Sequence, residues 1–473
     1  MAGRGVLALD QGGHASRAMV FDPQGKILAR AERRIATRRM GKAKVEHSPT
    51  ALLRSLQEAA EAAIRALPRG TEIEAAGLDT QRSSIACWDR LSGKALSPVI
   101  SWQDRRAARH VAALMNHSAR VTELTGLVLS PHYGASKLVW CLKNLPAVKE
   151  AARAGRLAAG PLASYAVAGL LEGRPCIADP VNGARTQLLD ISRGDWSEEL
   201  CELFGVPIDI LPGCVPNHHS FGDFKVAGRT IPLTVVTGDQ PAALFADGEP
   251  EAHVAYMNLG TGAFVQCLSD RPVPGLLRSV LWRDTDRTLY ALEGTVNGAG
   301  SALDAMAKKL RLDAARMLRA LPGWLDAAQE PPLYLNGVGG LGAPYWRPAF
   351  PSRFIGKGGP DRKIVAVSES IVFLLLENLA RMQEAGLPFT TLRVSGGLAQ
   401  LDALCQRLAD LSELPVERPL LHEATALGLA RLMGGASEAQ PAACTHFLPA
   451  SAPALAARRR RWQGELHAAL KPK

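Results

Sequence analysis

The stretch that decides the fold is VLALDQGGHASRAMVF, residues 6–21, in which two apolar runs flank a glycine-rich turn. The runs are short and typical of strands, and Asp10–His14 supplies the turn between them. A further alternating run at 26–33 follows a second turn signal and predicts a third strand. Together these segments predict a three-stranded antiparallel meander at the start of the chain.

The segments that follow indicate the class of the fold. Periodic apolar residues predict a helix over 48–67, with proline near its start and beyond its end. Short apolar runs then predict strands at 75–79 and 84–89. The order of three strands, one helix and another strand indicates an α/β domain with a mixed sheet.

The beginning of the chain has a counterpart in its second half. HVAYMNLGTGAFVQCLS, residues 253–269, again reads as strand, glycine turn and strand. A third glycine turn, Ser395–Gly397, lies between a short strand and a helix predicted over 398–411, and another helix is predicted over 422–433. We therefore expect two domains of similar topology and a basic, Ala/Pro/Arg-rich peripheral tail, with bounds 1–245, 246–440 and 441–473.

Composition narrows the class of protein. The chain has 473 residues, 47% of them hydrophobic, which excludes wholesale disorder and allows several domains. No run approaches the roughly 20 apolar residues of a membrane-spanning helix, and no secretory apolar region is present. We expect a cytoplasmic protein without a membrane partner. The eight cysteines are scattered without a CxxC pair, which argues against a zinc site or a disulfide framework.

The formal net charge of +10 raises the question of nucleic-acid binding. Basic residues cluster at 29–44 and 458–461, but neither cluster has interleaved aromatic residues, and no nucleic-acid-binding motif is visible. We expect no nucleic-acid partner. Two interpretations of the charge remain open: a solvated basic face, or attraction of polyanionic ligands such as nucleotides.

The glycine turns and two acids predict chemistry. Glycine lets a ligand approach the backbone closely, and turn N–H groups bind anions. Two such hairpins and a third turn that opens a helix therefore predict a polyphosphate site between two lobes. Asp10 and Asp239 both follow strand-like runs, where a carboxylate suits Mg²⁺. An Asx turn at Asp10 and a helix cap at Asp239 remain alternative interpretations.

A series of longer motifs occurs in order along the chain: ALDQG (8–12), SRAMVFD (16–22), VEHSP (45–49), WQDRR (102–106), SKLVW (136–140), GDQPAALF (238–245), LGTGAF (259–264), ALEGTV (291–296), GLGAPYW (340–346), SGG (395–397) and TALGLA (425–430). The series resembles the FGGY carbohydrate kinase family, and most closely its glycerol kinase branch. The resemblance implies two duplicated actin-like (ribonuclease H-like) ATPase domains with a central cleft. It also implies ATP and Mg²⁺ as cofactors, a small polyol or sugar as substrate, and a homodimer or homotetramer as the assembly.

The resemblance assigns roles to individual residues. Asp239 is expected to be the general base, and Asp10 and Asp239 are the acids expected near the metal. The residues expected to bind the acceptor are Arg82, Ser83, Trp102, His132, Asp239, Gln240 and Phe264. Those expected to bind ATP are Gly12, Gly13, His14, Ser16, Arg17, Thr261, Gly300, Asp304, Gly397 and Leu401.

The sequence departs from the family pattern in the first phosphate loop. Gly13, His14 and Ala15 stand where the family usually has hydroxyl residues, so that only Ser16 keeps a hydroxyl. Loss of one well-placed donor to a transition state can cost about 10²–10³ in rate. Two interpretations of His14 stay open: replacement of the lost phosphate contact, or a turn residue facing solvent.

The acceptor and nucleotide pockets also depart from the pattern. Ser83 stands where glycerol kinases have a glutamate, and His132 where they have a tyrosine. Sites built for particular hydroxyls discriminate strongly, so we do not expect glycerol to be the acceptor. Leu401 and Asp304 occupy polar positions of the adenine region, and Leu401 keeps only apolar packing against a base.

We therefore predict an ATP-dependent kinase of a small polyol or sugar that acts by domain closure and excludes water from the reaction. The alternative is a catalytically weakened nucleotide- or metabolite-binding scaffold on the same fold, which the altered loop and pocket suggest.

Overall fold

The structure is a computed structural model that describes residues 3–41, 43–327, 330–420, 423–440 and 442–471. The chain forms two compact units, each assembled from three stretches of sequence. The first unit comprises Met1–Pro250, Ser279–Tyr290 and His422–Pro441, and the second comprises Glu251–Arg278, Ala291–Leu421 and Ala442–Lys473. The prediction divided the chain into consecutive segments at residues 245 and 440. In the structure, each unit also includes short stretches that lie within or beyond the other unit in the sequence.

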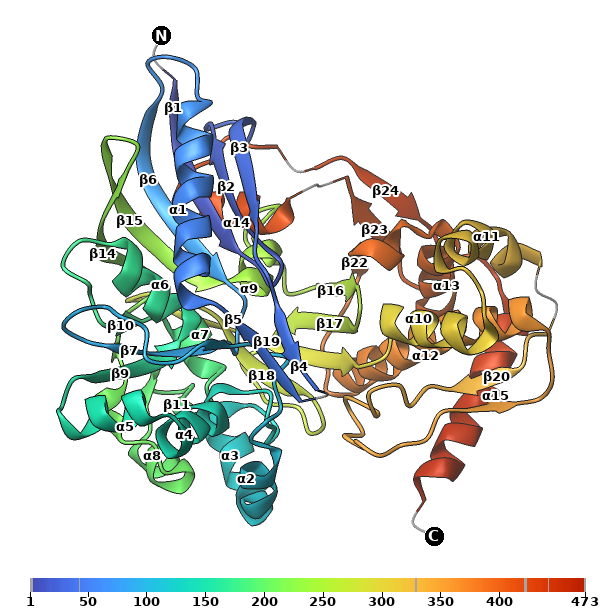
Figure 1. Cartoon of the computed structure of the whole chain (residues 1–473). Helices are drawn as coiled ribbons and strands as arrows, with labels where there is room; N and C mark the ends of the chain where they lie inside the picture. The colour runs from blue at the N-terminus through green and yellow to red at the C-terminus, as the bar shows by residue number, and fades with distance from the viewer. Residues whose placement is uncertain (1–2, 42, 328–329, 421–422, 441, 472–473) are drawn as a thin grey trace. The chain divides into compact units, whose positions relative to one another are not determined.

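A six-stranded sheet forms the centre of the first unit, with the strand order β14-β15-β6-β1-β2-β3 (Figure 1). The predicted meander is confirmed, since β1 pairs antiparallel with β2 and β2 with β3. β6 runs parallel to β1, and β15 runs parallel to β6, so these three strands end at the same edge. The bounds are β1 (Arg4–Gln11), β2 (Ala15–Phe21), β3 (Ile27–Arg34), β6 (Glu72–Thr80), β14 (His218–Val226) and β15 (Arg229–Gly238).

Helices cover both faces of this sheet. The predicted first helix is present as α1 and is capped by Ser48, whose Oγ accepts from the Ala51 N–H. Leu7 and Leu9 of β1 share an apolar cluster with α1 and α6. On the other face, α14 packs against β1, β6 and α9, close to Gly77. The bounds are α1 (Pro49–Arg65), α6 (Leu162–Leu170), α9 (Asp239–Leu244) and α14 (Ala424–Leu432); residue 422 of the predicted helix lies outside the described residues.

The first unit also contains a smaller sheet with the order β4-β5-β8-β7-β9 and the two-stranded sheets β10-β13 and β11-β12. Between residues 176 and 238 the chain forms short elements and the antiparallel hairpin β14–β15. The bounds are β4 (Arg38–Met40), β5 (Lys44–His47), β7 (Ile85–Asp89), β8 (Val99–Ile100), α2 (Ala108–Ala113), η1 (Met115–His117), α3 (Ser118–Thr125), α4 (Gly134–Asn144), α5 (Pro146–Arg153), β9 (Leu157–Pro161), β10 (Ile177–Ala178), α7 (Pro180–Ala184), β11 (Leu189–Asp190), β12 (Asp195–Trp196), α8 (Glu198–Phe204), η2 (Ile208–Ile210) and β13 (Gly213–Cys214).

The second unit repeats the central topology of the first. In the sheet of order β18-β19-β17-β16-β22-β23-β24, β17 pairs antiparallel with both β16 and β19, and β22 runs parallel to β16. This is the arrangement of β1, β2, β3 and β6, so the predicted similarity of the halves is confirmed. The bounds are β16 (Val254–Leu259), β17 (Ala263–Leu268), β18 (Leu277–Arg283), β19 (Thr288–Val296), α10 (Gly300–Leu310), α11 (Ala314–Ala327), β20 (Leu333–Leu335), β21 (Arg353–Ile355), α12 (Pro360–Glu384), β22 (Thr391–Ser395), η3 (Gly397–Gln400), α13 (Asp402–Ser412) and β23 (Val416–Pro419).

The C-terminal segment belongs to the core of the second unit. β24 (Cys444–Phe447) pairs with β23, and α15 (Pro453–Leu470) buries Trp462, whose indole N–H donates to the Tyr334 carbonyl at 2.8 Å. The prediction of a peripheral tail is wrong because Leu455, Trp462 and Leu466 form one apolar stripe on α15. The alanine- and arginine-rich composition around them hid this stripe.

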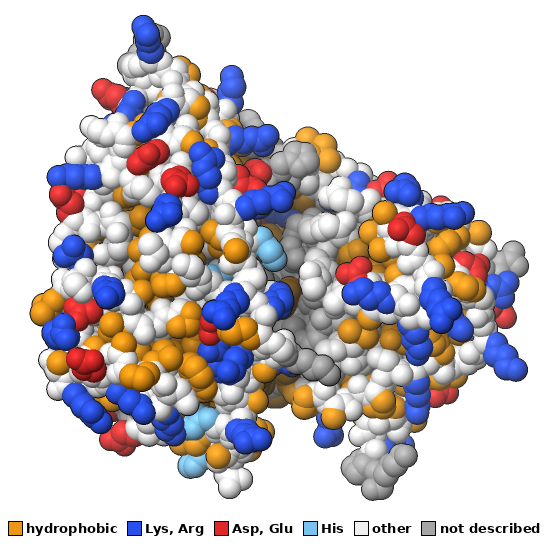
Figure 2. Space-filling view, in the orientation of Figure 1, with side chains coloured by type: hydrophobic (Ala, Val, Ile, Leu, Met, Phe, Trp, Pro, Cys, Tyr) orange, Lys and Arg blue, Asp and Glu red, His pale blue; other side chains and the backbone are white. Residues whose placement is uncertain are grey.

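The surface carries its basic residues on several elements. Figure 2 shows Lys and Arg side chains dispersed over the visible face among acidic and apolar ones. Within the cluster at 29–44, Arg30, Arg34 and Arg38 are exposed on β3 and β4. Across the ranges that the structure describes, no helix combines the length and the apolar character needed to cross a membrane.

Candidate active site

Three carboxyl groups lie where parallel strands of the first unit end. Asp10 of β1 is paired with Asp79 of β6, and Thr237 of β15 is also paired with Asp79. Asp239 follows β15 directly and begins α9. Because the carboxyl ends of parallel strands meet at one edge of a sheet, this topology brings the three acids together.

Burial raises the pKa of all three carboxyl groups above the usual aspartate value. The Arg17 guanidinium, 3.0 Å from Asp10 Oδ2, opposes the rise in the pKa of Asp10. The Arg82 guanidinium opposes it at Asp239. Asp79 is fully buried, and the nearby charges of Asp10 and Asp239 raise its pKa well above the usual value. Asp79 is thus the acid of the three that keeps its proton to the highest pH.

Arg82 and Gln240 form a pair beside Asp239. Arg82 Nη2 donates to Gln240 Oε1, and the Gln240 N–H donates to Asp239 Oδ1 at 2.8 Å. Gly238 packs against the stem of Arg82, where an added Cβ would lie 2.6 Å from both Cγ and Cδ. A side chain at Gly238 would therefore displace the guanidinium, which explains the glycine in front of Asp239.

The other predicted acceptor residues of the first unit come from segments that hydrogen-bond to one another. The Trp102 N–H donates to Ser84 Oγ at 3.0 Å, and the Trp102 carbonyl lies 3.2 Å from His132 Nδ1. Trp102 is 43% exposed, so its ring is available to a ligand. Burial lowers the pKa of His132, which makes its imidazole neutral at pH 7. Ser83 has a φ of 63°, in the left-handed region.

The predicted first phosphate loop is a tight turn between β1 and β2. The Gly12 N–H donates to the Ala15 carbonyl at 3.0 Å. Gln81, the residue that follows β6, supports the turn, since its Nε2 lies 3.3 Å from both Gln11 Oε1 and the Gly12 carbonyl. Gly12 and Gly13 are partly exposed, and His14 is exposed at the tip. The backbone of the turn is thus accessible to a ligand.

The structure does not place Ser16 as predicted. Ser16 is fully buried, and its Oγ lies 2.7 Å from Ser55 Oγ of α1. Alternation along β2 turns Ser16 toward the face that α1 covers, and turns Arg17 the other way, onto Asp10 and Glu32. The one hydroxyl that the sequence retains near this turn is therefore directed away from the glycines.

Three of the predicted ATP-binding residues, Thr261, Gly300 and Gly397, lie in or beside the glycine turns of the second unit. The Gly300 N–H donates to the Gly260 carbonyl at 2.9 Å, and the Ser301 N–H donates to the Thr261 carbonyl at 3.0 Å. These bonds hold the turn between β16 and β17 against the start of α10. Gly396 has a φ of 93°, and an added Cβ there would lie 2.6 Å from the Leu259 carbonyl oxygen. Gly396 therefore brings the third glycine turn, with Gly397, against the same loop.

Two further predicted residues lie elsewhere in the second unit. Asp304 is exposed on α10, four residues after Gly300 and so on the same side of the helix. Phe264 lies on β17, paired with Asn258 and Thr295. Phe264 thus belongs to the second unit, whereas the other predicted acceptor residues belong to the first.

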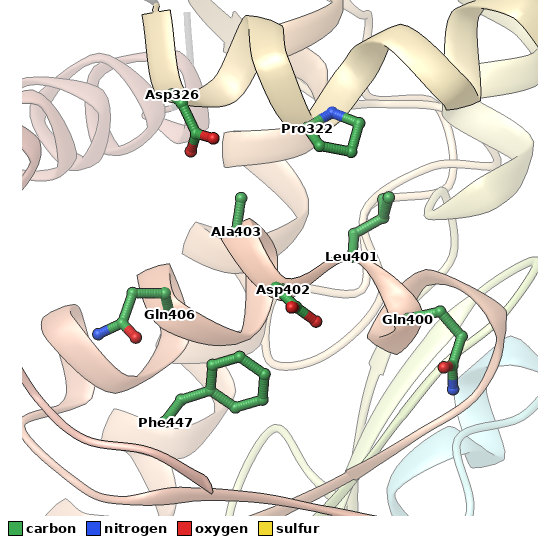
Figure 3. A pocket seen from close by; sticks show the side chains of 8 residues that line it. All are labelled: Pro322, Asp326, Gln400, Leu401, Asp402, Ala403, Gln406 and Phe447. Carbon is green, nitrogen blue, oxygen red and sulfur yellow. The ribbon is translucent and has the colours of Figure 1, made fainter. Parts of the chain in front are cut away.

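Leu401 lies in the wall of a pocket of about 490 Å³ in the second unit (Figure 3). Leu401 and Ala403 point toward α11, which contributes Pro322 and Asp326. The apolar part of this wall suits a flat ring better than a polar group. The lining residues are Pro322, Asp326, Gln400, Leu401, Asp402, Ala403, Gln406 and Phe447.

Sequence analysis missed Asp79. It predicted the strand 75–79 but assigned no role to the last residue of that strand. A signal was present, since Asp79 ends its strand-like run as Asp10 and Asp239 follow theirs. The missing information was the strand order, because only the position of β6 between β1 and β15 places Asp79 among the other acids.

The donor set of the first unit fits Mg²⁺. Among the described residues, no group of three or more His, Cys, Asp or Glu side chains is arranged to hold a metal ion. Mg²⁺ needs only one or two carboxylates, because phosphate and water oxygens complete its shell. Asp10 and Asp239 provide hard oxygen donors at the strand edge from which the Gly12 turn leaves. These residues fit Mg²⁺ that binds together with ATP.

Comparison with known proteins identifies the family. Residues 5–246 match the N-terminal domain of the FGGY family of carbohydrate kinases, and residues 255–437 match its C-terminal domain. Glycerol kinase of Methylobacterium nodulans is 36% identical over 447 residues, which cover 91% of this chain and 89% of that protein. The chain belongs to the FGGY family of carbohydrate kinases. It is accordingly an ATP-dependent phosphotransferase with an alcohol group as acceptor.

Solved structures confirm the fold. Glycerol kinase of Plasmodium falciparum with ADP superposes with a TM-score of 0.88 at 23% identity, covering 100% of this chain and 99% of that one. Xylulose kinase of Rhodospirillum rubrum has a TM-score of 0.87 at 18% identity, covering 99% of this chain and 100% of that one. The predicted class, two duplicated actin-like domains, is therefore confirmed.

Proposed function

We propose that this kinase transfers the γ-phosphate of ATP to a hydroxyl of a small polyol or sugar, with Asp239 as general base. The Asp239 carboxylate accepts the proton of the acceptor hydroxyl as that oxygen bonds to the γ-phosphorus. The bond from the γ-phosphorus to the bridging oxygen breaks, and ADP leaves. The observation that carries this proposal is the place of Asp239, partly exposed at the end of β15 beside the Arg82–Gln240 pair.

The ATP phosphates bind at two turns: at Gly12–Gly13, through the Gly13 N–H rather than the Gly12 N–H that donates to the Ala15 carbonyl, and at the turn at Thr261. Because Ser16 points into the core, this proposal leaves it out of the phosphate site. Asp10 and Asp239 would hold Mg²⁺, which neutralises charge on the phosphates when bound. Arg17 orients the Asp10 carboxylate through its hydrogen bond. Gly300, Asp304, Gly397 and Leu401 contact the nucleoside, with Leu401 packing on the base.

The acceptor is a polyol or sugar other than glycerol. The relative from Methylobacterium nodulans is a glycerol kinase, but this chain has Ser83 and His132 at two positions that differ from the glycerol kinase pattern. Ser83 removes a carboxylate that would accept from two hydroxyls, and a neutral imidazole replaces a phenol at His132. Trp102 and Phe264 pack against the carbon chain, while Arg82 and Gln240 bind hydroxyls. Closure of the two units around both substrates excludes water from the γ-phosphate.

The test is an ADP-release assay with Mg²⁺–ATP against glycerol, erythritol, ribitol, xylitol, xylulose, ribulose and a blank without acceptor. We expect release that depends on the acceptor and is faster with a longer polyol or a ketose than with glycerol. A flat panel, together with measurable ATP binding, would contradict the proposal and favour the weakened scaffold. Fastest release with glycerol would contradict the argument from Ser83 and His132 alone.

A further inference from the structure

Lys137 is a completely buried lysine in the first unit, close to the predicted acceptor residues. It lies in the first part of α4 and has no measurable exposure. Its Nζ donates to the Ser83 carbonyl at 2.8 Å and to the His132 carbonyl at 2.6 Å. Within the described residues, no carboxylate forms an ion pair with it. A lysine is rarely found fully buried unless it is paired.

Burial of Lys137 is unfavourable, so its retention calls for an explanation. Burial lowers the pKa of Lys137 to about 7, and the nearby Arg106 charge acts in the same direction. Asp104 opposes the shift, but its carboxylate is already engaged by Arg106, with Asp104 Oδ2 2.7 Å from Nη2. An apolar side chain would fill the same space without this cost. We therefore attribute the retention of the amino group to the hydrogen bonds that it donates to the carbonyls of Ser83 and His132.

The two carbonyls belong to separate segments that meet around Trp102. Ser83 precedes Ser84, which accepts from the Trp102 N–H, and His132 contacts the Trp102 carbonyl through Nδ1. Ser83 also adopts a φ of 63°, a conformation that a residue with a side chain adopts only when its surroundings hold it. Lys137 thus bridges the main chains on both sides of Trp102.

We propose that Lys137 is a positioning residue of the acceptor site. It holds the main chain at Ser83 and His132, so that Arg82, Trp102 and His132 present their side chains to the acceptor. This inference rests on the proposed function, because it assigns the acceptor to these residues. Lys137 itself touches neither the acceptor nor ATP. Its loss must therefore weaken acceptor binding while ATP binding stays unchanged.

The test is Lys137→Met, which keeps a long side chain but removes every donor. With the best acceptor of the panel, we expect the KM for the acceptor to rise about tenfold to a hundredfold. The KM for ATP should change by less than about threefold, since no ATP contact depends on Lys137. Lys143→Met is the matched control, because Lys143 is exposed on the same helix. It should leave both KM values unchanged.

Two more variants separate positioning from simple packing. Lys137→Arg keeps the charge and the donors, and should recover part of the acceptor affinity that Lys137→Met loses. Lys137→Gln keeps a single amide donor and replaces Lys137→Met if that variant does not fold. An unchanged acceptor KM in the folded variants would overturn the inference, as would unfolding of both Lys137→Met and Lys137→Gln. Wild-type protein that releases no ADP with any acceptor would instead overturn the proposed function, and the inference with it.

Discussion

Among single residues, Asp239 carries the proposed chemistry. Gly238 allows Arg82 to pack beside it, and the Gln240 N–H holds one of its oxygens at 2.8 Å. The carboxylate is thus oriented before any ligand binds, and catalysis of phosphoryl transfer depends mostly on such positioning. Asp10 and Asp79 share its strand edge, so the charge state of Asp239 also depends on theirs.

Asp239→Asn should lower kcat by about 10²–10⁴, because the amide cannot accept the acceptor proton. The affinity for Mg²⁺–ATP should change little, since Asp10 remains as a carboxylate ligand for the metal and asparagine can still accept the hydrogen bond from the Gln240 N–H. Initial rates of ADP release and calorimetric titration with ATP would measure the two effects. Asp223→Asn, an exposed aspartate on β14, is the control. Turnover retained in Asp239→Asn would remove this residue from the role of base.

The pH dependence of turnover should report the raised pKa of Asp239. Burial raises this pKa above 3.8, so protonation removes the base at a higher pH than for an exposed aspartate. As pH falls, kcat/KM should therefore decline through an apparent pKa above 3.8, which belongs to the whole acid cluster. A profile measured from about pH 8 down to about pH 4 would test this. A flat profile over that range would contradict it.

Among the elements, α15 shows how a basic segment can be structural. Arg458 donates to Glu369 of α12 through Nε at 3.0 Å and Nη2 at 2.6 Å. Arg459 Nη2 lies 3.8 Å from Oε1 of Glu377, which is about two helical turns beyond Glu369 on α12. Two of the four arginines at 458–461 thus neutralise buried acids, and the helix that carries them belongs to the core.

Arg458→Ala should lower the free energy of unfolding of the second unit by about 3 kcal/mol, because it leaves Glu369 buried without its closest partner. Arg407, 3.6 Å from Glu369, keeps the loss from being larger. Urea denaturation followed by tryptophan fluorescence would measure the change. Arg460→Ala, at an exposed position of the same helix, should change stability by less than about 0.5 kcal/mol. Equal effects of the two variants would contradict the assignment.

Across the whole molecule, two sheets of the same topology each contribute loops to the proposed reaction. The first unit carries the three acids and most predicted acceptor residues, and the second carries Thr261, Gly300, Gly397 and Leu401. The proposed base and the proposed nucleoside contacts belong to different units, so the proposed mechanism assigns one substrate mainly to each unit.

Ligand-induced closure should therefore require both substrates. Small-angle X-ray scattering should give a smaller radius of gyration with acceptor and a non-hydrolysable ATP analogue plus Mg²⁺ than with either ligand alone. Chelation of Mg²⁺ should abolish the change, because the analogue's phosphates then lose their counter-charge. The same radius in all four states would contradict closure as the mechanism that excludes water.

The sequence alone determined the strands of the first meander, their counterpart at 253–269, the glycine turns and the family, because these depend on local periodicity and on ordered motifs. Asp10 and Asp239 were found in this way. Tertiary structure decided the rest. Strand order placed Asp79 between them, and alternation against α1 turned Ser16 into the core. Packing made α15 part of the second unit and placed the Lys137 amino group within hydrogen-bond distance of the Ser83 and His132 carbonyls. Each of these depends on residues distant in sequence, whose pairing no local pattern specifies.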